Sequence, residues 1–352
     1  MNRGAPKLSD VARMAGVSPA TASRALSAPE RVRGETRAKV NHAARLLGYV
    51  PHGAARALAS QRSRMIGAVI PTLDNAIFAN SVNALQRALA ESGYTLLLGS
   101  HAYDPAVELQ VTRELIERGA DGIVFVGTDH DPQIYRMLDT FRTPYVLTWS
   151  LDPSGQHPCI GFNNRDAAIQ VTRHLLDLGH RRFAVVSGLS AHNDRVRERL
   201  AGVRDALRAR GLDLAPESIV ERPYSFASGQ EAMRDLMGRA PRPTAVVCIN
   251  DVLAIGAIIE CRAKGIEVPR VVSITGFDDM EIAAQLAPGL TTMRLPTIDL
   301  GRAAATYLLD RLAGREVIAC TELPVELVVR GSTGPPQDHV PPNAPMAAGG
   351  PH

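Results

Sequence analysis

The chain has 352 residues, 45% of them hydrophobic, so it is long enough for two or three domains with well-buried cores. Its net charge of +3 conceals an asymmetry, because residues 1–64 hold 12 Lys and Arg against 3 Asp and Glu, whereas residues 65–352 hold 27 against 33. No apolar run reaches transmembrane length and no signal peptide opens the chain, which argues against a membrane or secreted protein and predicts a cytoplasmic one.

Residues 8–26, LSDVARMAGVSPATASRAL, have the pattern of a helix-turn-helix. Apolar side chains recur at helical spacing in the first helix, at Leu8, Val11, Ala12 and Ala15. Gly16 suits the left-handed end of that helix, Ser18 suits the N-cap of the next one, and Pro19 suits its first position. A second helix is therefore predicted over residues 20–26. An ordinary corner between two helices would show the same local pattern.

The outward face of this second helix is small and polar and ends in a basic residue; its members are Pro19, Ala20, Thr21, Ser23 and Arg24. Such a surface can enter the major groove of DNA and read base edges. The excess of basic residues before residue 65 favours a polyanionic partner for this part of the chain. The side chains suited to phosphate contacts are Arg13, Arg24, Arg31, Arg33, Arg37, Lys39, Arg45 and Arg56. Any one of them could instead belong to a merely solvated face.

A third helix is predicted over residues 33–47, where Gly48 ends it and the inner face consists of Val40, Ala43, Ala44 and Leu47. Residues 53–60, GAARALAS, are good helix formers but span only about two turns, and a helix that short is marginal in water by itself. Residues 61–64 are interpreted as a linker.

From residue 65 onward, buried-strand patterns alternate with helical patterns. Strands are predicted over residues 66–70, 95–99, 122–126, 144–148, 159–162, 183–187, 244–249 and 272–277. Helices are predicted over residues 80–92, 106–118, 165–178, 195–210 and 252–264. This alternation is typical of α/β units built on parallel sheets, and it starts afresh after Pro158, which predicts two such units.

The last part of the chain continues with an extended segment at 290–296, a helix at 300–312 and one strand-like segment at 322–330. Residues 334–352 are rich in Pro and Gly and poor in apolar residues, so we expect them to be disordered. They contain no heptad pattern, so no coiled-coil tetramer is predicted.

The four cysteines, Cys159, Cys248, Cys261 and Cys320, are scattered along the chain. They form no CxxC motif and no Cys/His cluster with the spacing of metal ligands. We therefore expect reduced and mostly buried thiols, no metal ion and no cofactor.

The order of these parts, together with several runs of residues, resembles the lactose/galactose-repressor (LacI/GalR) family of bacterial transcription regulators. The matching runs include LSDVARMAGVSPATASRAL, RMIGAVIPTLDNAIFA, PTAVVCINDVLAIGAI and VPRVVSITGFDD, and the resemblance extends from Lys7 to Gly331. It implies an N-terminal all-α helix-turn-helix head and an α/β periplasmic-binding-protein-like core of two parallel-sheet lobes. Ala22 departs from the family, which usually has Val there, and Pro19 and Ala20 occupy positions that vary between members. The operator sequence of a relative therefore cannot be transferred to this chain.

The resemblance also implies domain boundaries. We expect the head at residues 1–50, a hinge helix and linker at 51–64, the core at 65–333 and a tail at 334–352. Within the core, the N-lobe is expected at about 65–158 plus 292–320, and the C-lobe at about 159–291 plus 321–333.

For DNA, the resemblance implies a homodimer whose two heads bind a pseudo-palindromic operator. The segment 53–60 would form a hinge helix on the operator, where Leu58 wedges into a base step of the minor groove. The expected DNA-binding residues are Ser18, Pro19, Ala20, Thr21, Ser23, Arg24, Arg33 and Leu58. Leu58 could instead pack against the head.

For a ligand, two such lobes are expected to close over a small molecule at the carboxyl ends of their strands. The expected effector-binding residues are Phe78, Trp149, Asn193, Arg195, Arg199, Asn250 and Asp278. Aromatic rings suit the apolar face of a sugar, amide and carboxylate groups suit its hydroxyls, and two arginines at a helix start suit an anionic group. Trp149 could instead be core filler, and Asp251 is as well suited to capping the helix at 252–264 as to binding a ligand.

The leading effector is a sugar acid such as gluconate, because IPTLDNAIFA and HPCIGFNNRDAA look most like gluconate-utilisation repressors. A neutral sugar and a purine are the alternatives. A plain sugar-binding protein would lack the basic head, and no motif of a nucleophile elbow, P-loop, zinc protease or dinucleotide-binding enzyme is present. The sequence therefore predicts a transcriptional repressor of carbohydrate or sugar-acid catabolism genes and no enzyme activity.

Overall fold

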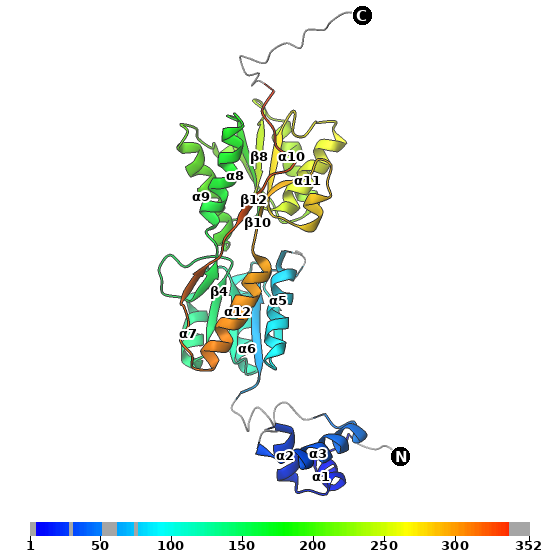
Figure 1. Cartoon of the computed structure of the whole chain (residues 1–352). Helices are drawn as coiled ribbons and strands as arrows, with labels where there is room; N and C mark the ends of the chain where they lie inside the picture. The colour runs from blue at the N-terminus through cyan, green and yellow to red at the C-terminus, as the bar shows by residue number, and fades with distance from the viewer. Residues whose placement is uncertain (1–4, 28–30, 51–61, 74–76, 338–352) are drawn as a thin grey trace, which may run out of the picture. The chain divides into compact units, whose positions relative to one another are not determined.

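The computed structural model describes residues 5–27, 31–50, 62–73 and 77–337 (Figure 1). Contacts divide the chain into two units, of which one holds the N-terminal helices and the other the α/β core. We call them the head and the core and describe each by itself.

The described part of the head, residues 5–27 and 31–50, contains three helices, α1 (Leu8–Ala15), α2 (Pro19–Ser27) and α3 (Gly34–Leu47). Gly16 ends α1 with φ +66°, and the Ser18 hydroxyl accepts a hydrogen bond from the Thr21 N–H at 3.1 Å, which caps α2. The three helices pack on a shared core of Val11, Ala12, Ala22, Ala25, Val40, Ala43 and Ala44. The predicted helix-turn-helix and third helix are thus confirmed, and Ala22 is fully buried rather than part of the outer surface.

The N-lobe of the core contains a six-stranded sheet in the order β11-β5-β4-β3-β1-β2. Its strands are β1 (Met65–Ile70), β2 (Thr95–Ser100), β3 (Gly122–Val126), β4 (Tyr145–Thr148), β5 (Cys159–Gly161) and β11 (Cys320–Glu322). The pairings of β1 with β3, β3 with β4, β4 with β5 and β5 with β11 are all parallel. Helices α5 and α12 pack on each other, as do α6 and α7; their bounds are α5 (Ile77–Glu91), α6 (Pro105–Glu117), α7 (Pro132–Phe141) and α12 (Thr297–Leu312).

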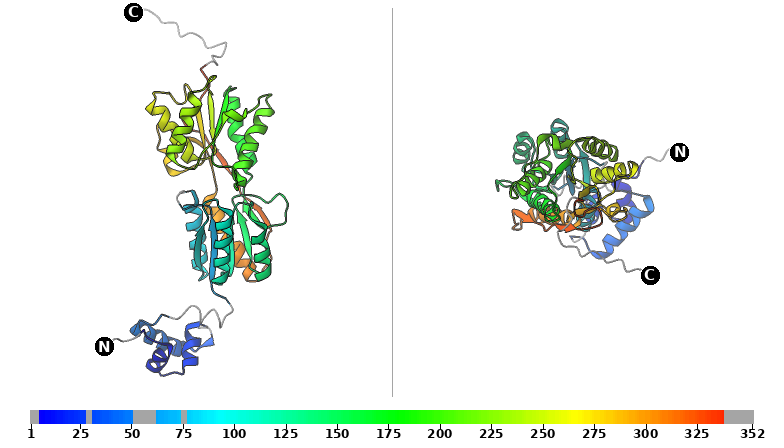
Figure 2. Two further views of the ribbon diagram at one scale, coloured as in Figure 1. Left: turned by 180° about the vertical axis from the view of Figure 1, so that it is seen from behind. Right: turned by 90° about the horizontal axis from the view of Figure 1, so that it is seen from above.

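The C-lobe repeats this architecture with a six-stranded sheet in the order β12-β10-β9-β8-β6-β7. Its strands are β6 (Phe183–Ser187), β7 (Ile219–Glu221), β8 (Ala245–Cys248), β9 (Ser273–Asp278), β10 (Thr291–Arg294) and β12 (Glu326–Val328). Only β12 is antiparallel to its neighbour among these described strands. Helices flank the sheet of each lobe (Figure 2). The helices of the C-lobe are α8 (Asn164–Asp177), α9 (Asp194–Arg208), α10 (Phe226–Met237) and α11 (Asp251–Ala263). Two short 3-10 helices, η2 (Pro216–Ser218) and η3 (Glu281–Ala284), complete the lobe as described.

The chain crosses between the two lobes three times within residues 77–337. The crossings are residues 162–163 between β5 and α8, 295–296 between β10 and α12, and 323–325 between β11 and β12. Parallel strands of one sheet have their carboxyl ends at the same edge. The crossings follow the carboxyl ends of β5, β10 and β11, so they lie at the edge where the two lobes meet.

The structure corrects three predicted boundaries. Residues 292–294 were assigned to the N-lobe, but they belong to β10, a strand of the C-lobe sheet. Cys159–Gly161 was assigned to the C-lobe, but it forms β5 in the N-lobe sheet between β4 and β11. The single strand expected at 322–330 is two strands, β11 and β12, which belong to different sheets and are separated by residues 323–325. A short apolar run fits either sheet equally well, so only the pairing partner decides which lobe it joins.

Three further elements, β7, α7 and α10, were not predicted from the sequence. The tail is also corrected at its start, because Pro336 is buried and the Gly334 carbonyl accepts hydrogen bonds from Ser273 at 3.0 Å and His180 at 2.8 Å. Residues 338–352 and the hinge segment at 51–61, including Leu58, lie outside the described residues. No described helix has both the length and the apolar character that a membrane crossing needs.

Candidate functional site

All seven side chains predicted to bind an effector line one cavity between the lobes. Ile77, Phe78, Tyr103 and Trp149 come from the N-lobe, and the C-lobe contributes Asn193, Arg195, Val196, Arg199, Tyr224, Asn250 and Asp278. They meet because each follows the carboxyl end of a strand or begins the helix after it. The cavity has a volume of about 30 Å³, which is room for little more than a water molecule.

Aromatic rings form the N-lobe side of this cavity. The rings of Phe78 and Trp149 meet edge to face with centroids 5.0 Å apart. Trp149 is buried and has φ +71°, an unusual conformation for a bulky residue, and the Asn164 amide donates a hydrogen bond to its carbonyl at 2.9 Å. Strained residues of this kind concentrate at ligand sites, which favours a binding role for Trp149 over core filling.

Arg199 lies on the C-lobe side and is held by three groups. Its Nε donates to the Asn164 Oδ1 at 2.8 Å and its Nη1 to the Ile249 carbonyl at 2.8 Å. The guanidinium stacks on the Phe277 ring at 3.7 Å from the centroid. Burial lowers the pKa of Arg199 from its ordinary value, because the charged form loses hydration. The side chain is therefore a rigidly positioned cation buried in the cavity between the lobes.

Asp278 is the nearest carboxyl group to Arg199, with its Oδ1 at 3.9 Å from the Arg199 Nη1. Both of its carboxyl oxygens are buried and accept no hydrogen bond from any described residue. Burial raises the pKa of Asp278 well above its usual range, and its backbone has φ +134°. A buried polar group without a partner is costly, so Asp278 marks a place where a ligand could supply hydrogen bonds.

Asn193 and Asn250 serve as helix caps as well as lining the cavity. The Asn193 Oδ1 accepts from the Val196 N–H at 3.4 Å, and the Asn250 Oδ1 accepts from the Leu253 N–H at 2.9 Å. Their oxygens are thereby used. The Asn193 amide also donates to the Tyr224 hydroxyl at 3.4 Å, which leaves its second N–H and the Asn250 NH₂ group as the donors suited to a ligand.

Asp251, which the sequence suggested as a possible cap or ligand residue, has a different role. Its carboxylate accepts from the Met280 N–H at 2.7 Å and from the Thr292 hydroxyl at 2.6 Å, and it does not line the cavity. Burial raises the pKa of Asp251 to about 6 despite these bonds. The cap of α11 is Asn250, and Asp251 links the neighbouring strands of the C-lobe.

A polar contact at the start of α9 joins the lobes, and we call it the interlobe latch. The Asp194 Oδ2 of the C-lobe accepts from the N-lobe hydroxyls of Ser150 at 2.6 Å and Thr128 at 3.0 Å, and from the Thr128 N–H at 3.1 Å. Its Oδ1 accepts from the Arg195 Nη1 at 3.0 Å. Burial alone would raise the pKa of Asp194, but Arg195 and these hydrogen bonds outweigh burial and lower it.

Gly127 allows this latch to form. It directly follows strand β3 and has φ +96°, and a Cβ at this position would overlap both Arg195 and Asp194. A second contact, between Asp129 and the Arg197 Nη2 at 2.7 Å, lies at the exposed rim of the same interface.

Sequence reasoning missed the two tyrosines of the cavity and the whole latch. Tyr103 follows β2, so the rule on carboxyl ends of strands could have found it. Tyr224 follows β7, a strand that the sequence did not reveal, and its ring packs where a side chain on Gly188 would otherwise lie. The latch joins residues up to 66 positions apart in the sequence, and no local pattern announces such a pairing.

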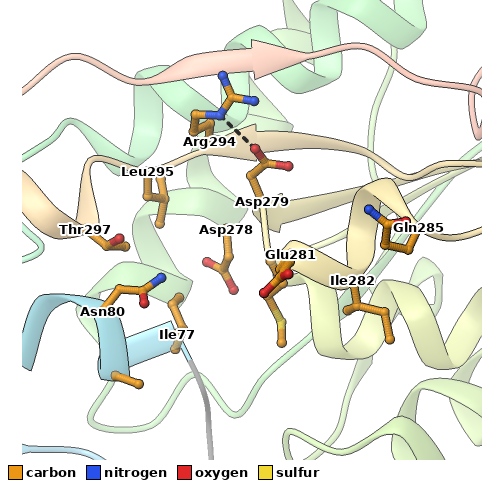
Figure 3. Close-up of a pocket in the computed structure, with 12 residues that line it drawn as sticks. Ile77, Asn80, Asp278, Asp279, Glu281, Ile282, Gln285, Arg294, Leu295 and Thr297 are labelled. Atoms are coloured by element: carbon orange, nitrogen blue, oxygen red, sulfur yellow. Dashed lines mark hydrogen bonds and ion pairs between the residues drawn. The ribbon is translucent and has the colours of Figure 1, made fainter. Parts of the chain in front are cut away.

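A second and larger cavity of about 610 Å³ adjoins Asp278 (Figure 3). It is lined by Ile77, Ala79 and Asn80 of α5, by residues 278–282 and Gln285 around η3, and by Arg294, Leu295 and Thr297 at a crossing between the lobes. An ion pair between Arg294 and Asp279 at 2.7 Å stands at its edge. Asp278 lines both cavities, so a ligand in either one would be within reach of its carboxyl group.

On the head, the predicted DNA-binding side chains lie on one helix and its neighbour. Ser18, Pro19, Ala20, Ser23, Arg24 and Arg33 are exposed, and Thr21 is half-buried. The Ser18 and Thr21 hydroxyls are 2.9 Å apart and bonded to each other. Arg24 forms no hydrogen bond or ion pair with another described residue. Arg33 is the N-cap of α3. Among the described residues, no three His, Cys, Asp or Glu side chains are grouped to hold a metal ion.

Comparisons with known proteins match both parts of the chain. Residues 7–52 match the family described as bacterial regulatory proteins, lacI family, and residues 172–333 match the periplasmic binding protein-like domain. The chain is 35% identical over 332 residues to the HTH-type transcriptional regulator GntR of Pseudomonas aeruginosa, covering 94% of this chain and 96% of that protein. It is 32% identical to the HTH-type transcriptional repressor CytR of Escherichia coli over the same shares of the two chains.

A solved structure shows the same architecture over nearly the full length. The lac repressor dimer bound to operator and the anti-inducer ONPF is 28% identical, with a TM-score of 0.82, covering 94% of this chain and all of that one.

Proposed function

Because this chain belongs to the LacI family of bacterial regulatory proteins, we propose that it represses genes of sugar-acid or other carbohydrate catabolism in the cytoplasm. At the level of the family, it is a DNA-binding transcriptional regulator with an effector-binding core, and its relatives are regulators rather than enzymes. The proposal adds an effector, a sugar acid such as gluconate, and a homodimer on a pseudo-palindromic operator.

The charge of the interlobe cavity is the observation that carries the choice of effector. Arg195 is paired with Asp194, whereas Arg199 has only the Asp278 carboxyl at 3.9 Å, and burial raises the pKa of that carboxyl. Arg199 therefore carries a positive charge to which no carboxylate of the described residues is hydrogen-bonded. A ligand carboxylate is the group that an Arg fork recognises best.

The rest of the cavity suits a polyhydroxyl chain or ring. The amides of Asn193 and Asn250 offer donors, and the carboxyl of Asp278 offers acceptors to hydroxyl groups. The edges and faces of Phe78 and Trp149 suit the C–H surface of a sugar. The resemblance of the middle of the chain to gluconate-utilisation repressors supports the same class of ligand.

Binding of such a ligand requires the lobes to separate, because the cavity of about 30 Å³ is far smaller than a hexose. A ligand that binds one lobe arrangement more tightly than another shifts the balance between them. This is the physical link through which the effector would change the affinity for DNA.

For DNA, we propose that α2 reads the operator from the major groove with Thr21, Ser23 and Arg24 while Ser18 and Arg33 contact the backbone. The exposure of Ser18, Ser23, Arg24 and Arg33 and the basic charge of the head support this assignment. The similar lac repressor structure is a dimer bound to operator, which supports two heads on one symmetric site. Leu58 is proposed to wedge into the minor groove.

Calorimetric titration of the full chain tests the effector, with gluconate as the sugar acid, glucose as the neutral sugar and a purine nucleoside as the third candidate. We expect heat with gluconate, and its absence at millimolar ligand would remove gluconate from the proposal. Arg199→Gln should weaken binding by about 30-fold or more, because a buried ligand charge loses its partner. The matched control is Arg165→Gln on the exposed face of α8, which should leave binding unchanged.

Selection of DNA from a random pool with the purified protein, with and without gluconate, tests the operator. A pseudo-palindromic site whose recovery depends on gluconate is expected. A preference without symmetry that ignores every candidate ligand would contradict the proposed function.

A further inference from the structure

Two cysteines lie side by side on neighbouring strands of the N-lobe, 161 positions apart in the sequence. Cys159 on β5 and Cys320 on β11 are register partners in the parallel pairing of these strands. Their sulfur atoms are 2.8 Å apart, and both thiols are free. The backbone holds this register on both sides, since the Cys159 N–H donates to the Ala319 carbonyl at 2.8 Å and the Leu323 N–H to the Gly161 carbonyl at 2.7 Å.

The two thiols differ in their access to solvent. Cys320 is exposed, so a small oxidant in solution can reach it, whereas Cys159 is fully buried behind it. Burial raises the pKa of the Cys159 thiol to about 12, so it is not itself a ready nucleophile toward solvent oxidants. This asymmetry is the arrangement of an attacking cysteine with a resolving cysteine beside it.

We propose that Cys159 and Cys320 form a redox-responsive pair that a peroxide converts into a disulfide bond. The Cys320 thiolate attacks one oxygen of hydrogen peroxide, the O–O bond breaks, hydroxide leaves and Cys320 becomes a sulfenic acid. The Cys159 sulfur then attacks the Cys320 sulfur, the S–O bond breaks, and the departing hydroxide takes the Cys159 proton as water. Two thiols lose two electrons in total, and one peroxide is reduced to two waters.

The backbone is already positioned for this bond. Partner residues on adjacent strands have Cα atoms roughly 5 Å apart, which lies within the range that disulfides span. The contact between the sulfur atoms requires only a small further approach for the bond to form. The disulfide can therefore form without rearrangement of the sheet, because the register of β5 and β11 already places the two cysteines opposite each other.

The position of the pair gives the bond a consequence for the whole core. β5 leads directly into the crossing at residues 162–163, and β11 leads directly into the crossing at 323–325. A disulfide between these strands ties together two of the three connections between the lobes within residues 77–337. It would restrain the movement of the C-lobe against the N-lobe. The bond itself is independent of the proposed function, whereas its effect on operator binding rests on that function.

The other two cysteines provide an internal comparison. Cys248 and Cys261 are fully buried in the C-lobe, and burial raises the pKa of both thiols. Neither is exposed, so peroxide should leave both of them reduced in the folded protein.

Bond formation is tested on the reduced full chain treated with hydrogen peroxide, followed by thiol counting and peptide mapping. We expect loss of two thiols, a linked pair of peptides containing Cys159 and Cys320, and recovery of both thiols with dithiothreitol. Cys320→Ser should keep all its remaining thiols, and Cys248→Ser, the matched control, should form the bond as the unaltered chain does. Cys159→Ser should stop at a Cys320 sulfenic acid that dimedone traps.

Two outcomes would overturn the proposal. One is a Cys320 that proceeds to sulfinic acid, or links to a second chain, while Cys159 stays reduced. The other is a disulfide that forms equally fast after the chain is unfolded with urea, because the folded register would then play no part.

The consequence for the lobes is measured on the same samples. The oxidised chain should melt several degrees higher than the reduced chain, and its response to an effector at the operator should change by about fivefold or more. Neither change should occur in Cys320→Ser. A disulfide that changes neither the melting temperature nor the effector response would contradict the restraint on the lobes. If neither the reduced nor the oxidised protein binds any operator, that result would count against the proposed function alone.

Discussion

At the scale of single residues, the interlobe cavity is distinguished by buried charged side chains whose charges are only partly compensated. Asp278 accepts no hydrogen bond from the described residues, and Arg199 is buried beside it with its charge only partly compensated. By contrast, Asp194 is equally buried yet accepts four hydrogen bonds from three residues. Unsatisfied groups cost stability, so their retention in a cavity is understandable when a ligand completes them.

The stability of the core should depend on pH through Asp278. The folded core binds the proton of this carboxyl more tightly than the unfolded chain does, because burial raises its folded pKa. Its contribution to stability is therefore fully present below the ordinary pKa of about 4 and is lost as the pH rises through the raised value. Asp278→Asn, which stays neutral, should raise the free energy of unfolding by about 1–3 kcal/mol at pH 8.

Thermal melts of both proteins between pH 4 and pH 8 check this prediction. The difference in Tm should be largest at pH 8 and should shrink toward pH 4, where both side chains are neutral. A variant that is less stable than the unaltered chain at pH 8 would show that the Asp278 charge is compensated after all.

Arg24 is the residue of α2 best suited to specify a base. It is exposed and bonded to no described residue, so Arg24→Ala should leave the head folded. Loss of a bidentate contact to guanine should weaken operator binding by about 1–3 kcal/mol and relax the preference at one base pair. Lys39→Ala, which removes a basic residue from α3, should instead weaken binding evenly across sequences. Fluorescence anisotropy with single-base operator variants distinguishes the two, and an unchanged base preference for Arg24→Ala would refute the assignment.

At the scale of elements, the start of α9 decides how the lobes meet. Its N-cap Asn193 and its first two turns, with Asp194, Arg195 and Arg199, supply the C-lobe side of the latch and much of the C-lobe side of the cavity. Gly127 at the end of β3 leaves the space into which this helix start fits. A change at the latch should therefore be felt in the cavity as well.

Removing the charge of Asp194 tests the latch. Asp194→Asn leaves Arg195 buried without its counter-charge and weakens the bonds to Thr128 and Ser150, so the free energy of unfolding should fall by about 3 kcal/mol. Thermal denaturation measures this loss of stability. Small-angle scattering should also show a more open core.

The control lies on the same helix. Asp205 pairs with Arg165 on the exposed surface, so Asp205→Asn should have no measurable effect on stability. Equal losses from the two substitutions would mean that the latch contributes no more than an ordinary surface pair.

At the scale of the whole molecule, the chain combines a basic head with an acidic core. The head carries the excess of Lys and Arg that attracts phosphates, and the core repels DNA through its excess of Asp and Glu. Operator affinity should consequently fall steeply as the salt concentration rises, since each phosphate contact releases a counterion.

The proposed link between head and core is the segment that contains Leu58. Leu58→Ala should weaken operator binding strongly, because the minor-groove wedge that opens the base step is lost. Binding of effector to the core should be unaffected, which calorimetry measures on the same protein. Unchanged operator affinity would contradict the wedge and would leave Leu58 as a packing residue.

Local patterns in the chain predicted most of its secondary structure and the residues that line the interlobe cavity. Helical and strand periodicities, with Gly16, Ser18 and Pro19 as end signals, predicted the head and most of the core elements. Six of the seven cavity residues were predictable because parallel strands bring their carboxyl ends to one edge, so position along a strand implies position in space, whereas Asn193 was expected from the family resemblance.

Contacts between segments that are distant in the chain could not be predicted in this way. The assignment of β5 to the N-lobe, the entry of Tyr224 into the cavity, the latch at Asp194 and the contact of Cys159 with Cys320 all join residues far apart in the chain. A periodic pattern reports which face of an element is buried but not what it is buried against. The partner of a buried face is set by packing between the lobes and by pairing between strands. The stabilisation from such a contact depends on the residues of both partners, so neither segment predicts it alone.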